Sequence, residues 1–479
     1  MGDRLYSAAE AAQDLAAAGL LSGMLGPGAA DFPSGAAGGF AGATLDSRLL
    51  KERELFIALP GERVDGRKFI PEVLARGHWV LTDVVPDLAS KDTPEGAGLL
   101  LSNDPVAALN HLARCWRQRR NPLVVGVTGT NGKTTTKDFI AALLGAAGPV
   151  LATTGNFNNC LGLPVTVLGL RPEHSFAVIE MGASAQGEIK PLAEVAGPSI
   201  GVITNASPAH LAEFGSLDGI IAGKGELLDV LPKDGFAVLN ADSPGFGRWS
   251  DRAPCRVKSF GLTGGDNRWS WFPGGTDPEK ESGPVLEFGG KSWPVPLPGR
   301  HNGANLAAAI LVARAAGLKD KKIAEGLRNF RGSAHRGVLL DIGGRKILDD
   351  CYNANPTSMV AAAEALAGVP GPGRLIAVLG HMGELGSHSR EFHVETGRCL
   401  AAGPVEVLVT VGEQTESMAE GFKQGGQKAH SCATIAEAAD WLADNTKEGD
   451  RILVKGSRSA GLEELLNEMS VRFGKGQGD

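Results

Sequence analysis

The sequence predicts an α/β protein of three domains: an N-terminal mixed α/β substrate-binding module, a central P-loop domain with a parallel sheet, and a C-terminal Rossmann-like doubly wound domain. A chain of 479 residues is too long for one ordinary domain. Apolar strand-like runs alternate with helical runs from residue 123 onward, and this alternation starts afresh after Ala334. We therefore expect domains at residues 1–120, 121–334 and 335–479.

The first expected domain shows no catalytic pattern of its own. Short strand-like runs at 54–61 and 78–85 are mixed with helical segments. An apolar-striped helix at 106–120 ends in several arginines, and Asn121-Pro122 then forms a natural boundary. The arginines could form a phosphate-binding patch or simply the solvated, cationic end of a helix, which the helix dipole favours.

The two later domains are predicted from regular alternation of strands and helices, which specifies a parallel sheet with helices on both faces. Helices are expected at 134–147, 219–231 and 300–317, and the glycine- and proline-rich segment 261–298 is expected to form short antiparallel strands. The predicted parallel strands lie at 123–128, 175–182, 199–205, 236–240, 345–352, 374–380, 405–412 and 450–456.

Composition excludes several classes of function. A formal net charge of -7 gives no electrostatic reason to expect nucleic acid as a partner. The six cysteines lie far apart, so they indicate neither a disulfide framework nor a structural zinc site. The N-terminus lacks the order of a signal peptide, and no apolar run reaches the length of a membrane span. We expect a reduced, cytoplasmic protein.

A glycine-rich loop, "GVTGTNGKTTTK" at 126–137, carries the strongest chemical pattern. A phosphate loop needs backbone N–H groups, a lysine for the β- and γ-phosphates and a hydroxyl for Mg²⁺, all at the start of a helix. The expected nucleotide-binding residues are Gly129, Thr130, Asn131, Gly132, Lys133, Thr134 and Thr135.

This loop departs from the strict Gly-x-x-x-x-Gly-Lys-Thr pattern by one residue. Val127 stands where the first glycine should be, and Gly126 is displaced by one position. The loop is therefore a variant, and an ordinary glycine-rich turn between a strand and a helix is the alternative.

Glu180 is the first candidate partner for a metal ion in this loop. Mg²⁺ prefers oxygen ligands, and a carboxylate that ends an apolar strand is costly unless it is used. His210 follows the next strand and is a weaker candidate, because a lone histidine in a loop is more often satisfied by its own surroundings.

Seven ordered segments together resemble the Mur ligases. The resemblance extends from about residue 44 to about residue 465, and the "GNFNN" and "DDCYNANPTSM" segments favour the branch that adds a dipeptide. The other five segments are "GVTGTNGKTTTK", "VIEMGASAQGEI", "VITNASPAHLAEFGS", "LPGRHNGAN" and "VKGSRS".

The resemblance implies an ATP-dependent amide ligase of peptidoglycan precursor synthesis. No segment resembles a large dedicated interface, so we expect a monomer. ATP would activate the terminal carboxylate of UDP-N-acetylmuramoyl-tripeptide as an acyl phosphate, which the amine of D-alanyl-D-alanine then attacks. A different Mur ligase, adding one amino acid to a shorter muropeptide, is the nearest alternative. A non-catalytic nucleotide-binding homologue is the other.

The resemblance also implies two Mg²⁺ ions, held by Thr134, Glu180, His210 and Lys224, with the lysine carbamylated. Lys224 on a solvated helix face is the alternative that the residues alone favour. Lys133, His210 and Lys224 are the implied catalytic residues.

Further roles come from the same resemblance. Asn302, with His301, matches the adenine side of the nucleotide site. Arg336 matches a residue that faces phosphate, and Asp350 one that faces ribose. Substrate-binding positions are matched by Ser47 and Arg48 at the UDP end, by Asn158 and Asn159 at the muramoyl part, and by Lys455, Ser457 and Arg458 near the cleft.

Two positions differ from the family pattern. His381 stands where aspartate is usual, and Cys160 where a polar or acidic residue is more common. A metal site of His381, His388 and His393 is not expected, because their spacings of 7 and 5 residues do not place them on one helical face.

Overall fold

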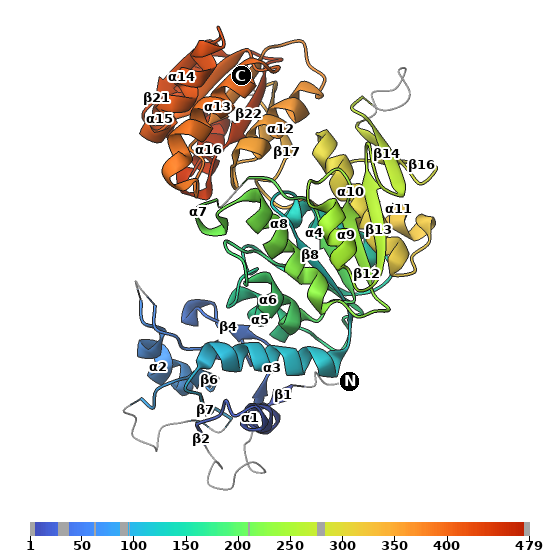
Figure 1. Ribbon diagram of the computed structural model, residues 1–479. Coiled ribbons are helices and arrows are strands. Elements are labelled where there is room, and N and C mark those ends of the chain that lie inside the picture. The colour runs from blue at the N-terminus through green and yellow to red at the C-terminus, as the bar shows by residue number, and fades with distance from the viewer. Residues whose placement is uncertain are drawn as a thin grey trace.

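The computed structural model describes residues 5–26, 38–61, 64–86, 94, 96–208, 211–274 and 283–473, with the side chains of 211 and 212 excepted. Three main sheets follow one another along these residues, and each is formed from one continuous stretch of chain. Their strands span 23–101, 123–294 and 338–455. The three sheets succeed one another from bottom to top in Figure 1. The domain boundaries themselves stay predictions.

The N-terminal sheet has the order β2-β7-β6-β5-β4, in which only the edge strand β2 runs antiparallel to its neighbour. A separate antiparallel pair joins β1 to β3. The strands are β1 Tyr6–Ser7, β2 Gly23–Leu25, β3 Gly39–Phe40, β4 Ala43–Thr44, β5 Leu55–Ile57, β6 Trp79–Thr82 and β7 Gly98–Leu101. The helices are α1 Ala8–Ala17, α2 Ile70–Ala75 and α3 Pro105–Arg120.

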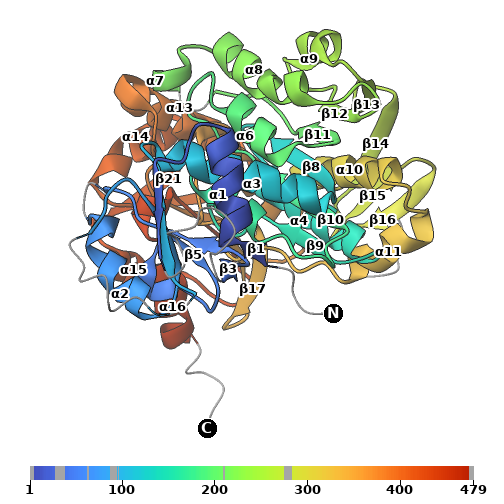
Figure 2. The same ribbon diagram turned by 90° about the horizontal axis from the view of Figure 1, so that it is seen from below.

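Helix α3 packs the N-terminal region against the central one. Trp116 is buried, stacks on Tyr6, and donates its indole N–H to the carbonyl of Leu170 at 3.1 Å. One apolar core continues from α1 through α3 into the central helices, and Figure 2 shows α1 and α3 beside α6. Burying aromatic rings of this size makes the contact strongly favourable, so the two regions share a core.

The central sheet has the order β16-β15-β14-β13-β12-β11-β8-β10-β9 in the described residues. Strands β8 to β14 are parallel, whereas β14, β15 and β16 are antiparallel, as the weak pattern of 261–298 predicts. The strands are β8 Leu123–Thr128, β9 Val150–Ala152, β10 Phe176–Glu180, β11 Ile200–Ile203, β12 Phe236–Asn240, β13 Arg256–Gly261, β14 Asn267–Phe272, β15 Val285–Phe288 and β16 Lys291–Pro294.

Helices cover both faces of this sheet. Helix α10 is rich in alanine and almost entirely buried, which allows it to lie closely against α4. The central helices are α4 Lys133–Gly145, α5 Gly162–Leu168, α6 Ile189–Ala196, α7 Leu211–Phe214, α8 Leu217–Gly225, α9 Phe246–Arg252, α10 Arg300–Ala315 and α11 Asp320–Arg328.

The C-terminal sheet has the order β17-β18-β22-β19-β20-β21, parallel except for β17. It is a doubly wound sheet with an antiparallel edge strand. Its strands are β17 Val338–Ile342, β18 Arg345–Asp349, β19 Leu375–Leu379, β20 Val407–Val411, β21 Lys428–Cys432 and β22 Arg451–Lys455, and its helices are α12 Pro356–Ala367, α13 Ser389–Ala401, α14 Glu416–Gln424, α15 Ile435–Asn445 and α16 Glu463–Phe473.

The membrane expectation can be examined only for helices within the described ranges. None of those helices is both long enough and apolar enough to cross a bilayer.

Candidate active site

The glycine-rich loop lies between β8 and α4, at the carboxyl edge of the central sheet. Gly132 has φ +78° and precedes the first helical residue, so the loop enters α4 through a left-handed turn. A Cβ on Gly132 would lie 2.4 Å from Asn305 Oδ1, and one on Gly129 would lie 1.9 Å from Thr204 Oγ1. Gly129 also has a positive φ, of +146°, so both glycines are required by space and by backbone conformation.

Polar residues that follow β11 hold the loop in place. Asn205 accepts from the N–H of Asn131 at 2.9 Å, and the Thr204 hydroxyl donates to the Asn131 carbonyl at 2.6 Å. Ser207 accepts a further bond from the Asn131 side chain at 3.1 Å. Sequence reasoning missed these supports, although a polar pair directly after a buried strand could have indicated them.

Lys133 lies over the loop. Its Nζ donates to the carbonyls of Gly129 at 2.9 Å and Thr130 at 3.0 Å. Burial lowers the pKa of Lys133, while the charge of Glu180 opposes that shift and the charge of Arg336 adds to it. The cation is thus held where a phosphate could replace the carbonyls as its partner.

Thr134 and Glu180 form a buried oxygen pair at the start of α4. The Thr134 hydroxyl donates to Glu180 Oε2 at 2.8 Å, and Asn158 Nδ2 donates to Glu180 Oε1 at 2.9 Å. Glu180 is only 3% exposed. Hard oxygen donors of this kind suit Mg²⁺, so the residues present fit a magnesium ion on this side of the site.

Lys224 lies on α8, away from solvent rather than on a solvated face. It is 3% exposed, donates to the Ala183 carbonyl at 3.2 Å, and has its Nζ 5.1 Å from the centre of the Phe214 ring. Burial, with a smaller effect from the charge of Lys133, lowers its pKa to about 7. A substantial share of neutral amine is therefore present near neutral pH.

An ammonium cannot ligate a metal ion, and Mg²⁺ prefers oxygen to an amine nitrogen, so Lys224 fits that role as a carbamate. Near it, Glu226 accepts from the N–H groups of Gly187, Ile189 and Lys190 at 2.6 to 3.1 Å and caps α6. His210, the remaining expected metal ligand, lies outside the described residues. Its position toward Lys224 stays a prediction.

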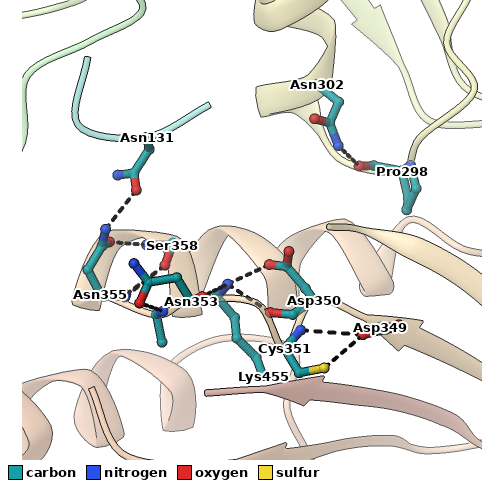
Figure 3. A network of polar contacts seen from close by, with 11 residues as sticks. Asn131, Pro298, Asn302, Asp349, Asp350, Cys351, Asn353, Asn355, Ser358 and Lys455 are labelled. Carbon is teal, nitrogen blue, oxygen red and sulfur yellow. Dashed lines mark hydrogen bonds and ion pairs between the residues drawn. The ribbon is translucent and has the colours of Figure 1, made fainter. Parts of the chain in front are cut away.

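Asn302 is buried on α10 and belongs to a polar chain that reaches the phosphate loop. It donates to the Pro298 carbonyl at 2.7 Å (Figure 3) and accepts from Asn305 at 3.1 Å. Asn305 in turn accepts from Thr136 on α4 at 3.2 Å. Asn302 thus positions the residue against which Gly132 packs.

A cavity of about 980 Å³ opens at the start of α10, between the central region and α12. His301, Trp269 and Trp271 line it from the central region, and Glu364 and Ala365 from α12. A pocket with ring systems and a few polar groups is of a kind that takes a flat heterocycle.

Arg336 and Asp350 both lie at the start of the C-terminal region. The Arg336 guanidinium stacks 3.9 Å from the centre of the Tyr352 ring. Asp350 Oδ2 is paired with Lys455 Nζ at 2.6 Å, and the same ammonium donates to the Asn353 carbonyl at 2.8 Å (Figure 3). Lys455 is buried and holds Asp350 in place. Its contact with the substrate stays a prediction.

The remaining residues of the last motif lie near this pair. Ser457 is buried, with its hydroxyl 3.1 Å from that of Ser459. Arg458 is exposed and pairs with Glu463 at 3.0 Å. Asn355 links this region to the loop by donating to Asn131 Oδ1 at 2.7 Å. The segment around Asn355 was singled out from the sequence, but this contact with Asn131 was not predicted.

The expected UDP-end residues lie in the N-terminal region, shortly after β4. Ser47 is buried and its carbonyl accepts from Arg76 at 3.1 Å, whereas Arg48 is 85% exposed and forms a fork with Asp46 at 2.7 to 2.9 Å. Arg48 thus has the surface ion pair that is the plain alternative to a substrate contact. Within the described residues, neither side chain has a hydrogen bond or ion pair with the phosphate loop.

Of the two asparagines expected at the muramoyl part, only Asn158 contacts Glu180. Asn159 instead accepts from the N–H of Gly162 at 2.8 Å, at the start of α5, and is exposed together with Cys160. Cys160 is therefore a surface residue next to Asn159.

The three C-terminal histidines have separate partners. His381 contacts the Ser459 hydroxyl at 2.9 Å, His393 is buried and accepts from the Met382 N–H at 3.0 Å, and His388 pairs with Glu391 at 3.3 Å. Among the described residues they form no cluster of metal-ligating atoms, as the spacing predicts.

Comparison with known proteins gives matches along most of the chain. Residues 127–313 match the Mur ligase middle domain, and residues 335–458 match the Mur ligase glutamate ligase domain. The chain is 35% identical to UDP-N-acetylmuramoyl-tripeptide–D-alanyl-D-alanine ligase of Bacillus subtilis, over 89% of this chain and 93% of the relative.

Solved structures give the same result. A crystal structure of MurF from Acinetobacter baumannii has a TM-score of 0.81 at 31% identity, covering 98% of this chain and 100% of that one. MurF ligase from Thermotoga maritima, solved in complex with ADP, has a TM-score of 0.77 at 28% identity, covering 90% of this chain and 98% of that one.

Proposed function

The chain belongs to the Mur ligase family, and we propose that it joins D-alanyl-D-alanine to UDP-N-acetylmuramoyl-tripeptide at the expense of ATP. The observation that carries the proposal is the grouping of Lys133, Thr134 and Glu180 at one helix start, in a chain whose relatives match it over about nine-tenths of its length. The peptide product would be a UDP-linked pentapeptide of peptidoglycan precursor synthesis.

The chemistry proceeds in two transfers. A carboxylate oxygen of the tripeptide attacks the γ-phosphorus of ATP, which forms an acyl phosphate and releases ADP. The amine of D-alanyl-D-alanine then attacks the acyl carbon, phosphate leaves, and the amine gives up a proton. Because phosphoryl transfer is mainly a matter of positioning and charge neutralisation, the protein needs placed cations and N–H groups more than a covalent nucleophile.

The loop residues have defined tasks in this scheme. Residues 129–135 present backbone N–H groups to the phosphates at the positive end of α4. Lys133 exchanges its loop carbonyls for phosphate oxygens. Asn131 is oriented by Asn205 and contacts Asn355, so its loop conformation depends on the C-terminal region.

Magnesium neutralises phosphate charge when bound, and Thr134 with Glu180 would hold one ion. A second ion would be held by His210 and by Lys224 as its carbamate. The low pKa of Lys224 favours that modification, because only the neutral amine adds carbon dioxide.

The nucleotide and substrate assignments complete the proposal. Asn302 and His301 would hold adenine at the mouth of the 980 Å³ cavity, with Arg336 toward phosphate and Asp350 toward ribose. Closure of the C-terminal region would bring the last two into place. The substrate contacts would be made by Ser47, Arg48, Asn158, Asn159, Lys455, Ser457 and Arg458.

We also propose the cellular location and the oligomeric state of the enzyme. ATP and nucleotide-linked wall precursors are cytoplasmic, so we place the enzyme there. We also propose that it acts as a monomer.

The test is phosphate release from ATP by the purified protein. Release should require both UDP-N-acetylmuramoyl-tripeptide and D-alanyl-D-alanine, and the product should have the mass of the pentapeptide. A parallel arm offers UDP-N-acetylmuramoyl-dipeptide with diaminopimelate or lysine. Release only in that arm would show a neighbouring Mur ligase activity, and release in neither arm would overturn the ligase assignment.

A further inference from the structure

A second cluster of potential metal ligands lies outside the phosphate loop, where β18 ends. His335, Asp349 and Cys351 each offer one donor atom, and these atoms all lie within 4.8 Å of one another. His335 Nδ1 is 2.9 Å from Asp349 Oδ2, and Cys351 Sγ is 3.0 Å from Asp349 Oδ1 and 3.5 Å from His335 Nδ1. Figure 3 shows Cys351 directed at Asp349.

The chain conformation brings these three donors together. Asp349 is the last residue of β18 and Cys351 follows in the next turn, so both project from one strand end. His335 arrives from the connection between the central and C-terminal regions and has φ +61°, a left-handed conformation. The N–H of Tyr352 donates to the His335 carbonyl at 3.1 Å and fixes the two segments side by side.

The donor set selects the kind of ion. One imidazole nitrogen, one thiolate and one carboxylate oxygen suit Zn²⁺ or Co²⁺ better than Mg²⁺, which prefers oxygen alone. A tetrahedral ion with these ligands needs donor separations of roughly 3.3–3.7 Å. The sulfur-to-nitrogen distance of 3.5 Å already fits. The contacts of Asp349 with His335 and Cys351 use different carboxylate oxygens, so the carboxylate must turn to present one of them to the ion, and that contact must lengthen by a few tenths of an ångström.

Burial and charge agree with this choice. Asp349 and Cys351 are buried, whereas the His335 side chain is 32% exposed, which leaves a route of entry and a fourth position for water. The carboxylate of Asp349 attracts a cation, which would displace the thiol proton of Cys351 on binding.

We propose that His335, Asp349 and Cys351 form a binding site for one zinc-like divalent cation. The site adjoins two residues of the proposed function: Arg336 follows His335 in the chain, and Asp350 lies between Asp349 and Cys351. A bound cation fixes both segments in their present arrangement. Because the proposed closure must move Arg336 and Asp350 into place, the bound cation inhibits ligation. This consequence rests on the proposed function, whereas the binding itself does not.

Binding is tested first, with Co²⁺ as a spectroscopic probe in the presence of excess Mg²⁺. The full-length protein should bind one Co²⁺ and show a thiolate-to-cobalt charge-transfer band. Cys351→Ala should lose the band, and Cys432→Ala, which removes a buried cysteine from the same sheet, should keep it. His335→Gln changes a partly exposed position, so this variant should fold normally. It should weaken Co²⁺ binding by more than about 10–100-fold, which is the loss expected when a residue that only orients a metal ligand is replaced.

The outcomes separate the binding site from its effect on the reaction. Absence of stoichiometric binding, or binding retained in both Cys351→Ala and His335→Gln, would overturn the site. If the site is present, Zn²⁺ at one equivalent should slow phosphate release by the parent protein, and His335→Gln should need at least tenfold more Zn²⁺. Binding without inhibition would overturn the inhibitory role alone, and loss of ligase activity in every sample would count against the proposed function while leaving the cobalt result intact.

Discussion

Thr134 and Glu180 face each other across the ends of two neighbouring parallel strands, with the threonine hydroxyl 2.8 Å from the carboxylate. Residues of β8 and β10 pair in register, so the loop after β8 and the last residue of β10 must meet at the carboxyl edge. Asn158 occupies the other carboxylate oxygen. Glu180 is thereby held in one orientation before any ligand arrives.

Replacing Glu180 with Gln should abolish most activity while leaving the fold intact. The amide keeps the size of the side chain but removes the negative charge and the proposed metal ligand, so we expect a loss of about 100-fold or more in kcat. The measurement is phosphate release across a range of Mg²⁺ concentrations. The control, Asp234→Asn, removes the same charge at an exposed turn, and near-normal turnover by Glu180→Gln at low Mg²⁺ would contradict the assignment.

Lys133→Ala should also lose turnover without unfolding. Its ammonium makes two polar contacts with loop carbonyls, so we expect a stability change of no more than about 1–2 kcal/mol but a drop of at least about 100-fold in phosphate release. Urea unfolding and phosphate release together check this. Lys233→Ala, at an exposed position, is the control and should be unchanged in both measurements; substantial activity in Lys133→Ala would remove the lysine from the phosphate site.

Gly132→Ala tests the close approach of the loop to α10. Its φ of +78° and the 2.4 Å approach of a Cβ to Asn305 both oppose the substitution, so we expect a destabilisation of about 1–3 kcal/mol. Gly145→Ala, at the last residue of α4, meets nothing within 4 Å and should be neutral or slightly stabilising. The comparison is made by thermal unfolding, and equal stability of the two variants would show that the loop relaxes around the added methyl group.

The strand-and-loop part of this site was predictable because it follows from order along the chain. The Gly132-Lys133-Thr134 sequence lies between an apolar strand and a helix, and Glu180 ends the next predicted strand, so a parallel sheet brings them to one edge. Strand β21 was not predicted, because this edge strand is mostly exposed and has no apolar pattern. β9 was missed because it is only three residues long.

The supports of the site could not be predicted in the same way. Asn305 contacts Thr136 across 169 residues, and Asn355 contacts Asn131 across 224. No periodicity links residues at such separations, since their meeting depends on how helices α10 and α12 pack. The cluster of His335, Asp349 and Cys351 could not be predicted either. Cysteine spacing excludes zinc-finger patterns, but it does not show that a histidine from another segment lies beside a cysteine.

Lys224 should make stability depend on pH. Its pKa is lowered to about 7 in the folded protein, while in the unfolded chain it is near the ordinary lysine value of about 10.4. Between these values the unfolded chain binds more protons, so this group makes stability rise with pH, by at most about 1.4 kcal/mol per unit. Below about pH 7 both states are protonated and its contribution is constant.

The measurement is urea unfolding from pH 6 to 9 in buffer free of carbon dioxide, for the parent protein and for Lys224→Met. The difference in unfolding free energy should shift in favour of the parent as pH rises above 7. Lys233→Met, at an exposed site, should show no such trend. A flat difference for Lys224→Met would mean that the lysine is charged throughout and thus poorly placed for carbamylation.

Substitutions at Asn355 can distinguish its capping of α12 from its contact with the phosphate loop. Its side-chain oxygen accepts from the Ser358 N–H at 2.9 Å and caps α12, while its Nδ2 donates to Asn131 in the phosphate loop. Asn355→Ser keeps a capping oxygen but is too short to reach Asn131. Asn355→Ala loses both the cap and the contact with Asn131, and it should cost about 1 kcal/mol of stability. Both variants should lower kcat/KM for ATP by roughly 2–10-fold, the value of one hydrogen bond, although only the alanine variant should melt earlier. A serine variant with unchanged kcat/KM would show that the contact between Asn355 and Asn131 plays no part in assembling the site.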